Sequence, residues 1–239
     1  MRWLIGFALI VAAVSGYVAI NSATVRYRLT LEAEIDGVRK TGAGVVEVSY
    51  SKQNLPISQA EFRIDIRGDA VVVDLGPRGQ LFALLREGSD SRSGADYIVL
   101  RAFNFPGGAL PRPVLDGLGK VRRLSGKVDL PLRSLPLLVR FRDLDAPMTI
   151  ERVDPLDLGR SFGTGARLVG ATLEIVSPGV WPFNRIGITG ESITRGIDQT
   201  LKWIPNYYNR QLDGDRVESA SAPLRLANSL SSRDFKAGP

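Results

Sequence analysis

The first apolar stretch of the chain, residues 3–20, contains no charged side chain, and Arg2 is the only charged side chain before it. A helix needs about 20 apolar residues to cross the hydrocarbon core of a bilayer, with a lower limit of about 17. Trp3 and Tyr17 lie near the ends of the stretch, where aromatic rings favour the membrane interface. We therefore predict a transmembrane anchor over residues 1–24. Its membrane-contacting side chains include Trp3, Leu4, Phe7, Leu9, Ile10 and Tyr17.

A cleaved secretory signal peptide is the alternative interpretation of the same stretch. Met1-Arg2 is then the short basic region, residues 4–14 are the apolar region, and Val14-Ser15-Gly16 supplies small residues at the cleavage site. The two interpretations differ in whether the following domain stays attached to the membrane.

Strict alternation of apolar and polar positions begins directly after this stretch. Over residues 25–35 the side chains alternate, which predicts a strand with one buried and one solvated face. Asp36-Gly37 is a hairpin turn signal, and a return strand follows at 44–51. We expect the glycines at 42 and 44 to mark a bulge.

Further short strands are separated by turns rich in Gly, Pro or Asp. We predict them at 61–66, 70–75, 80–86, 96–103, 137–142, 148–153 and 167–176. Helices are predicted at 114–124, at 156–162 with Asp154 as the N-cap, and at 191–204. The fold class is therefore α+β, mainly β: a transmembrane helix followed by an antiparallel β-sheet or sandwich with two or three short helices.

The domain organisation follows from the same pattern. A globular domain is expected over residues 25–204, with a sub-boundary near the Pro- and Gly-rich residues 104–113. Residues 205–239 are polar and small, so we expect a mobile tail.

The composition narrows the chemistry. The chain has no Cys and no His, so disulfides, thiolate nucleophiles, Ser–His triads and His or Cys metal sites are excluded. We predict no catalytic residue, no metal ligand and no cofactor. Two alternatives remain for a hydrolase. One uses the acids Asp143, Asp145, Glu151, Asp154 and Asp157, and the other uses a Ser–Lys pair in Ser49-Tyr50-Ser51-Lys52.

Positive charge is concentrated between residues 112 and 142. Eight basic side chains oppose only Asp116 and Asp129 there, so this window carries a net +6. A solvated face is the plainest interpretation, and contact with anionic lipid or an acidic partner is the alternative. Nucleic acid is not expected, because no aromatic residues alternate with the charges. The candidate interaction residues are Arg112, Lys120, Arg122, Arg123 and Lys127, together with Trp181 and Phe183 from an aromatic loop.

Two segments resemble an uncharacterised family of bacterial membrane-anchored or exported proteins. They are residues 135–176, from LPLLVRFRD through VDPLDLGRSFG, and residues 193–204, ITRGIDQTLKWI. The resemblance implies no activity and no site residues. The resemblance and the predicted anchor together predict a single-pass protein of the bacterial inner membrane. Arg26 and Arg28 after the anchor favour a cytoplasmic domain, but long domains are exported regardless of their charge, so we predict a periplasmic one.

Together these observations predict a membrane-anchored, non-enzymatic, β-rich protein. Its partners are the lipid bilayer through residues 3–20 and a protein, in a larger membrane or envelope assembly. The hydrolase and a peripheral anionic-lipid binder acting through residues 112–142 are the alternative functions.

Overall fold

The computed structural model describes residues 3, 16–17, 20–53, 61–88, 94–180, 183–185, 188–208, 210–214 and 226–238. Most of the predicted anchor, including Leu4, Phe7, Leu9 and Ile10, lies outside them. Within the described ranges, no helix is long and apolar enough to cross a membrane.

The first sheet has six antiparallel strands in the order β10-β3-β2-β1-β9-β6. Its strands are β1 (Ser22–Ile35), β2 (Val38–Lys52), β3 (Phe62–Asp69), β6 (Lys127–Asp129), β9 (Ala166–Val176) and β10 (Lys236–Ala237). The predicted hairpin turn joins β1 to β2, and both Asp36 and Gly37 have positive φ there. The alternation of β1 is also confirmed, since Tyr27, Leu29 and Leu31 are buried on one face.

The second sheet has four antiparallel strands in the order β4-β5-β7-β8. They are β4 (Val71–Asp74), β5 (Gln80–Glu87), β7 (Pro136–Phe141) and β8 (Ile150–Arg152). Both faces of this sheet are buried, because alternate side chains of β5 enter different cores. Leu81 and Ala83 belong to the first core, whereas Phe82 and Leu84 belong to the second.

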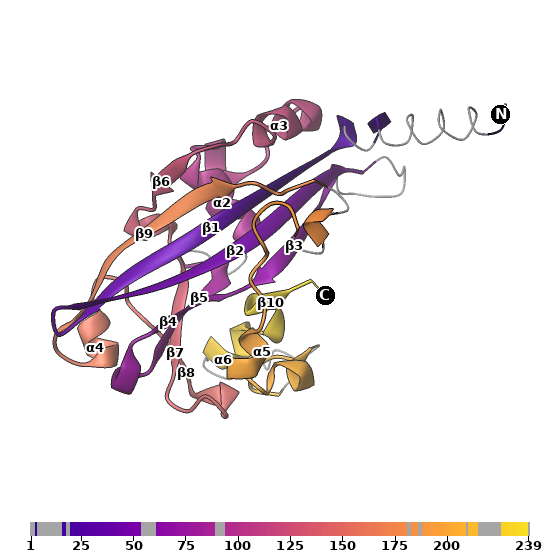
Figure 1. Cartoon of the computed structure of the whole chain (residues 1–239). Helices are drawn as coiled ribbons and strands as arrows, with labels where there is room; N and C mark the ends of the chain where they lie inside the picture. The colour runs from indigo at the N-terminus through magenta and orange to yellow at the C-terminus, as the bar shows by residue number, and fades with distance from the viewer. Residues whose placement is uncertain are drawn as a thin grey trace.

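The layers follow from these two cores (Figure 1). The first core lies between the sheets and includes side chains of α2 (Ala95–Ala102), α3 (Val114–Val121) and α4 (Leu158–Phe162). The second core lies on the other side of the second sheet, under α5 (Ile197–Thr200), η6 (Ile204–Tyr207) and α6 (Leu226–Ser229). The mainly β fold with antiparallel sheets and short helices is confirmed. Residues before and after 104–113 share the first core, so this stretch does not separate two cores.

The predicted strand at 96–103 is wrong, because this segment is helix α2. Its apolar side chains recur at helical spacing: Ala95, Ile98 and Val99 are all buried against the first core. Ile98 and Val99 are β-branched, which favoured the strand in the sequence. Burial of one helical face decides the structure instead.

The predicted helix at 191–204 is also wrong over most of its length. Residues 191–196 are not helical and contact the first sheet, with Thr194 N donating to Val45 O at 3.0 Å and Val45 N donating to Thr194 Oγ1 at 2.8 Å. Gly196 has φ of 106°, and only four residues of α5 follow it. Pairing with the sheet replaces the helical hydrogen bonds.

The domain extends past the predicted boundary at 204. Leu230 and Phe235 are 1% and 0% exposed, and β10 pairs with β3 at Gly68 and Asp69. Residues 226–238 are therefore part of the fold and contribute to the second core. Residues 215–225 are not among the residues that the structure describes.

Candidate functional site

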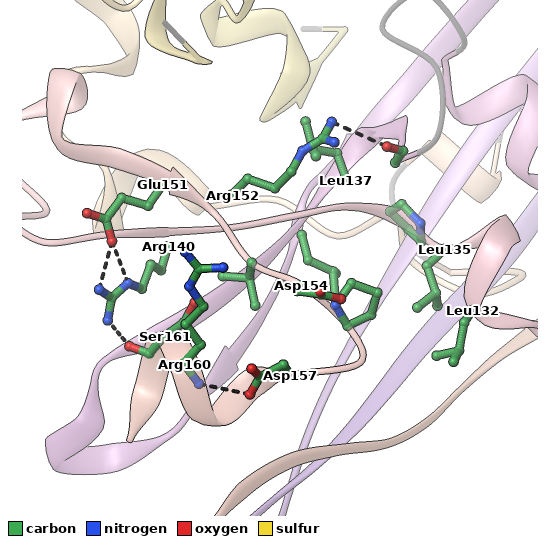
Figure 2. A pocket seen from close by; sticks show the side chains of 15 residues that line it. Leu132, Leu135, Leu137, Arg140, Glu151, Arg152, Asp154, Asp157, Arg160 and Ser161 are labelled. Carbon is green, nitrogen blue, oxygen red and sulfur yellow. Dashed lines mark hydrogen bonds and ion pairs between the residues drawn. The ribbon is translucent and has the colours of Figure 1, made fainter. Parts of the chain in front are cut away.

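A cavity of about 710 Å³ opens between strands β7 and β8 and helix α4 (Figure 2). This volume is within the range of small-molecule sites. Leu132 and Leu135 lie at one end, and Arg140, Glu151 and Arg160 lie at the other.

The charged groups of the cavity contact the protein itself. Arg140 Nε donates to Glu151 Oε2 at 2.9 Å, and Arg152 Nη2 donates to Gly88 O at 3.3 Å. The three arginines that line the cavity are balanced by three carboxylates, namely Arg140, Arg152 and Arg160 against Glu151, Asp154 and Asp157.

Of the acids considered for a hydrolase, Glu151 pairs with Arg140 and Arg142, and Asp143, Asp154 and Asp157 accept local hydrogen bonds. Asp143 Oδ1 accepts from Asp145 N at 3.0 Å, and Asp154 Oδ1 accepts from Leu156 N at 2.9 Å, as in Asx turns. The predicted N-cap was Asp154, but α4 begins later and its N-cap is Asp157, whose side chain accepts from Arg160 N at 3.1 Å. Within the described part of the chain, no group of three acids could hold a metal ion. These contacts favour turn and cap roles for the acids.

We expect Asp157→Ala to lower the free energy of unfolding by about 1 kcal/mol, because the cap hydrogen bond is lost. Asp157→Asn keeps an oxygen acceptor and is expected to stay close to wild type. Urea denaturation of the full chain measures both. Equal losses for the two variants would show that the charge, and not the cap, matters here.

The Ser–Lys pair also fails on geometry. Ser49 and Lys52 are three residues apart on strand β2, so their side chains point to opposite faces of the sheet. Ser49 Oγ lies 2.9 Å from Thr24 Oγ1, on the face opposite the first core.

The sequence segments that carry the family resemblance form structural parts of this region. Leu138 and Val153 are buried, and the turn at Asp154 and the cap at Asp157 lead into buried Leu158. Packing and chain reversal therefore account for these positions, without a reactive group.

The predicted interaction residues gather at the end of the first sheet where β1 begins. Arg122 Nη2 donates to Ile20 O at 2.6 Å and Nε donates to Ser22 O at 3.0 Å, so α3 holds the last residues of the apolar stretch. Arg112 pairs with Glu61 at 3.2 Å, next to the start of β3. Lys127 begins strand β6, opposite Glu174 near the end of β9. Of the other basic residues in the window, Arg140 and Arg142 lie on or beside β7 and pair with Glu151.

The loop after β9 lies at the same end, on the opposite face of the sheet from α3 (Figure 1). The end of β9 is next to the start of β1, because Val176 is the register partner of Arg26. Val180, Phe183 and Ile188 project from this loop with exposures of 64%, 50% and 67%. Trp181 lies outside the described residues.

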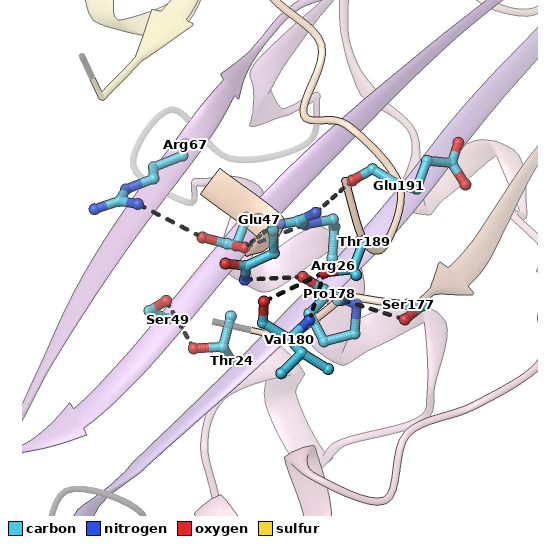
Figure 3. Close-up of polar contacts among 12 residues, drawn as sticks. Thr24, Arg26, Glu47, Ser49, Arg67, Ser177, Pro178, Val180, Thr189 and Glu191 are labelled. Atoms are coloured by element: carbon cyan, nitrogen blue, oxygen red, sulfur yellow. Dashed lines mark hydrogen bonds and ion pairs between the residues drawn. The ribbon is translucent and has the colours of Figure 1, made fainter. Parts of the chain in front are cut away.

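Contacts of Arg26 and Arg28 fix the base of this loop to the sheet, and those of Arg26 are drawn in Figure 3. Arg26 is 3% exposed, donates from Nε to Glu47 Oε2 at 3.1 Å, and also donates to Glu191 O. Arg28 donates to the Glu191 carboxylate and, at 2.8 Å, to Glu174. The hydrogen bond that Arg28 donates to the Glu191 carboxylate raises the pKa of Arg28. The loop thus has a defined position beside β1. The sequence did not predict this position, because Glu191 is 165 and 163 residues from its partners Arg26 and Arg28.

A second buried polar group lies under α2. Tyr27 donates to Ala95 O at 3.2 Å, and Tyr50 donates to Asp96 O at 3.3 Å. Burial raises the pKa of Asp96 and of both tyrosines. Glu87, at 1% exposure, pairs with Arg101. These groups face the core and their contacts anchor α2 to the sheets.

Comparison with known proteins finds no matching family model, no similar curated protein and no similar solved structure.

Proposed function

We propose that this chain is a membrane-anchored, non-enzymatic β-rich protein that binds a protein partner in a larger membrane or envelope assembly. The observation that carries the proposal is the contact of Arg122 with Ile20 and Ser22. It joins the end of the apolar stretch to α3, and β1 begins at Ser22 without a linker. A stretch held this way sets the distance of the domain from the bilayer.

Two further observations support a binding role rather than catalysis. The chain has neither His nor Cys, and three of the acids that could replace them, Asp143, Asp154 and Asp157, accept hydrogen bonds in turns and a helix cap. We further propose that the chain spans the bacterial inner membrane once and that its domain lies in the periplasm. The alternative location of the domain is the cytoplasm.

Co-purification tests the partner. We expect a tagged full chain, extracted from its native membranes with a mild detergent, to bring a second protein in a fixed ratio. Cross-linking before extraction and mass spectrometry would identify it. A chain that migrates alone, both with and without cross-linking, would contradict the proposal.

A further inference from the structure

Two cations on α3 and just after it have no acidic partner within the described residues. Lys120 and Arg123 are exposed and three positions apart, so they lie on the same side of the helix end. They line a cavity of about 280 Å³ with Phe103, Phe105 and Leu124. The space is ample for a phosphate group, and two cations at its rim suit an anion.

This cavity lies next to the predicted exit point of the anchor. Arg123 follows Arg122, whose guanidinium binds Ile20 O at 2.6 Å. Five of the basic residues of the window lie at this end, namely Arg112, Lys120, Arg122, Arg123 and Lys127. Arg112 pairs with Glu61, and Lys127 lies opposite Glu174 in the sheet register.

The same end carries exposed apolar side chains on both sides of the sheet. Val180, Phe183 and Ile188 project from the loop after β9, and Leu115 on α3 is 40% exposed. Ile20, at 61% exposure, lies at the same end, where its backbone oxygen accepts from Arg122. Apolar side chains beside cations are the pattern of surfaces that rest in the headgroup layer of a membrane.

We propose that this end of the domain, which we call the anchor-proximal surface, docks on anionic lipid headgroups of the bilayer that holds the anchor. Lys120 and Arg123 bind a headgroup phosphate. Val180, Phe183 and Ile188 enter the interfacial layer of the membrane. The inference rests on the proposed anchor and adds a fixed orientation of the domain. Helix α4 and strands β7 and β8, which line the larger cavity, lie toward the other end of the first sheet (Figure 1).

The chain has no cysteine, so one introduced cysteine reports on one position. We would attach an environment-sensitive fluorophore to Phe183→Cys or, as the distant control, to Met148→Cys, which is 54% exposed in the native chain. The full chain is reconstituted into vesicles of phosphatidylcholine with or without phosphatidylglycerol. With phosphatidylglycerol, we expect blue-shifted emission and quenching by brominated acyl chains at position 183 and neither effect at position 148.

Charge reversal tests the headgroup contact. Each basic side chain near an anionic surface contributes about a fivefold preference for the docked state. We therefore expect Lys120→Glu/Arg123→Glu to lower the docked-to-undocked ratio at least about 25-fold. Lys202→Glu/Arg210→Glu changes the net charge equally at two exposed residues outside this surface and should leave the ratio unchanged.

Vesicle flotation separates this inference from the proposed function. If the chain floats with the vesicles but the probe at position 183 stays in water, or is quenched equally in both lipids, docking is overturned while the anchor stands. If the two charge-reversal variants behave alike, the headgroup contact is overturned. If the chain does not float with either vesicle, the anchor itself is contradicted, and the inference falls with it.

Discussion

Arg26→Met is expected to lower the free energy of unfolding by about 3 to 5 kcal/mol, because it leaves the Glu47 carboxylate buried without its main partner. Glu47 is 8% exposed, and the next cation, Arg67, is 3.9 Å away. The substitution also removes the hydrogen bond to Glu191 O that holds the loop after β9. Urea denaturation of the full chain in detergent measures the loss.

Two further variants show whether burial is the cause. Arg39→Met breaks an exposed pair with Glu32 at 3.5 Å and should cost below about 1 kcal/mol. Arg26→Met/Glu47→Leu replaces both charges by apolar groups and should recover much of the loss. A loss for Arg26→Met no larger than that for Arg39→Met would contradict the buried-pair interpretation.

Gly42→Ala is expected to lower the free energy of unfolding by about 3 kcal/mol, at the upper end of the usual range for overpacking. A Cβ at this position would lie 2.2 Å from Val72 O and 2.9 Å from Val73 Cγ2. The first of these is a backbone atom of β4, so the two sheets would have to move apart. Thermal or urea unfolding of the variant measures the effect.

Gly170→Ala is the matched control on the same sheet. It lies on β9, has ordinary φ, and a Cβ there would meet no atom within 4 Å. We expect it to be neutral or to stabilise by about 0.4 to 1 kcal/mol, since alanine restricts the unfolded chain. If both glycine variants behave alike, close contact between the sheets does not explain Gly42.

The strands that could be predicted from the sequence are those whose apolar and polar residues alternate. The first sheet has one solvated face, and β1 and β9 alternate accordingly. The glycine at 42 was correctly singled out but wrongly assigned to a bulge. The β1–β2 register is continuous past Gly42, and the residue is needed for the close approach of β4.

The failures are at segments whose partners are distant in sequence. Residues 191–196 pair with Val45, and the C-terminal residues pack on β5 and β7, so their local periodicity and polarity were poor guides. Trp203 is 6% exposed and donates to Leu144 O at 3.0 Å, so it belongs to the second core. Such positions depend on the tertiary fold rather than on propensity.

The candidate site was predictable only in part. Charge counting found Lys120, Arg122 and Arg123, because eight basic residues in one window are visible without a fold. That these cations lie at the start of β1, while Arg140 and Arg142 pair with Glu151, depends on strand order. The position of Phe183 at this end of the first sheet depends on the contacts of Glu191 with Arg26 and Arg28.

The central claim is that residues 3–20 stay attached and hold the domain to a membrane. Alkaline carbonate extraction of native membranes, followed by mass spectrometry of the N-terminal peptide, tests it most directly. We predict that the chain remains in the membrane pellet and that the peptide containing residues 3–20 is recovered from it. A chain released into the supernatant, with an N-terminus between residues 15 and 24, would show a cleaved signal peptide and contradict the account.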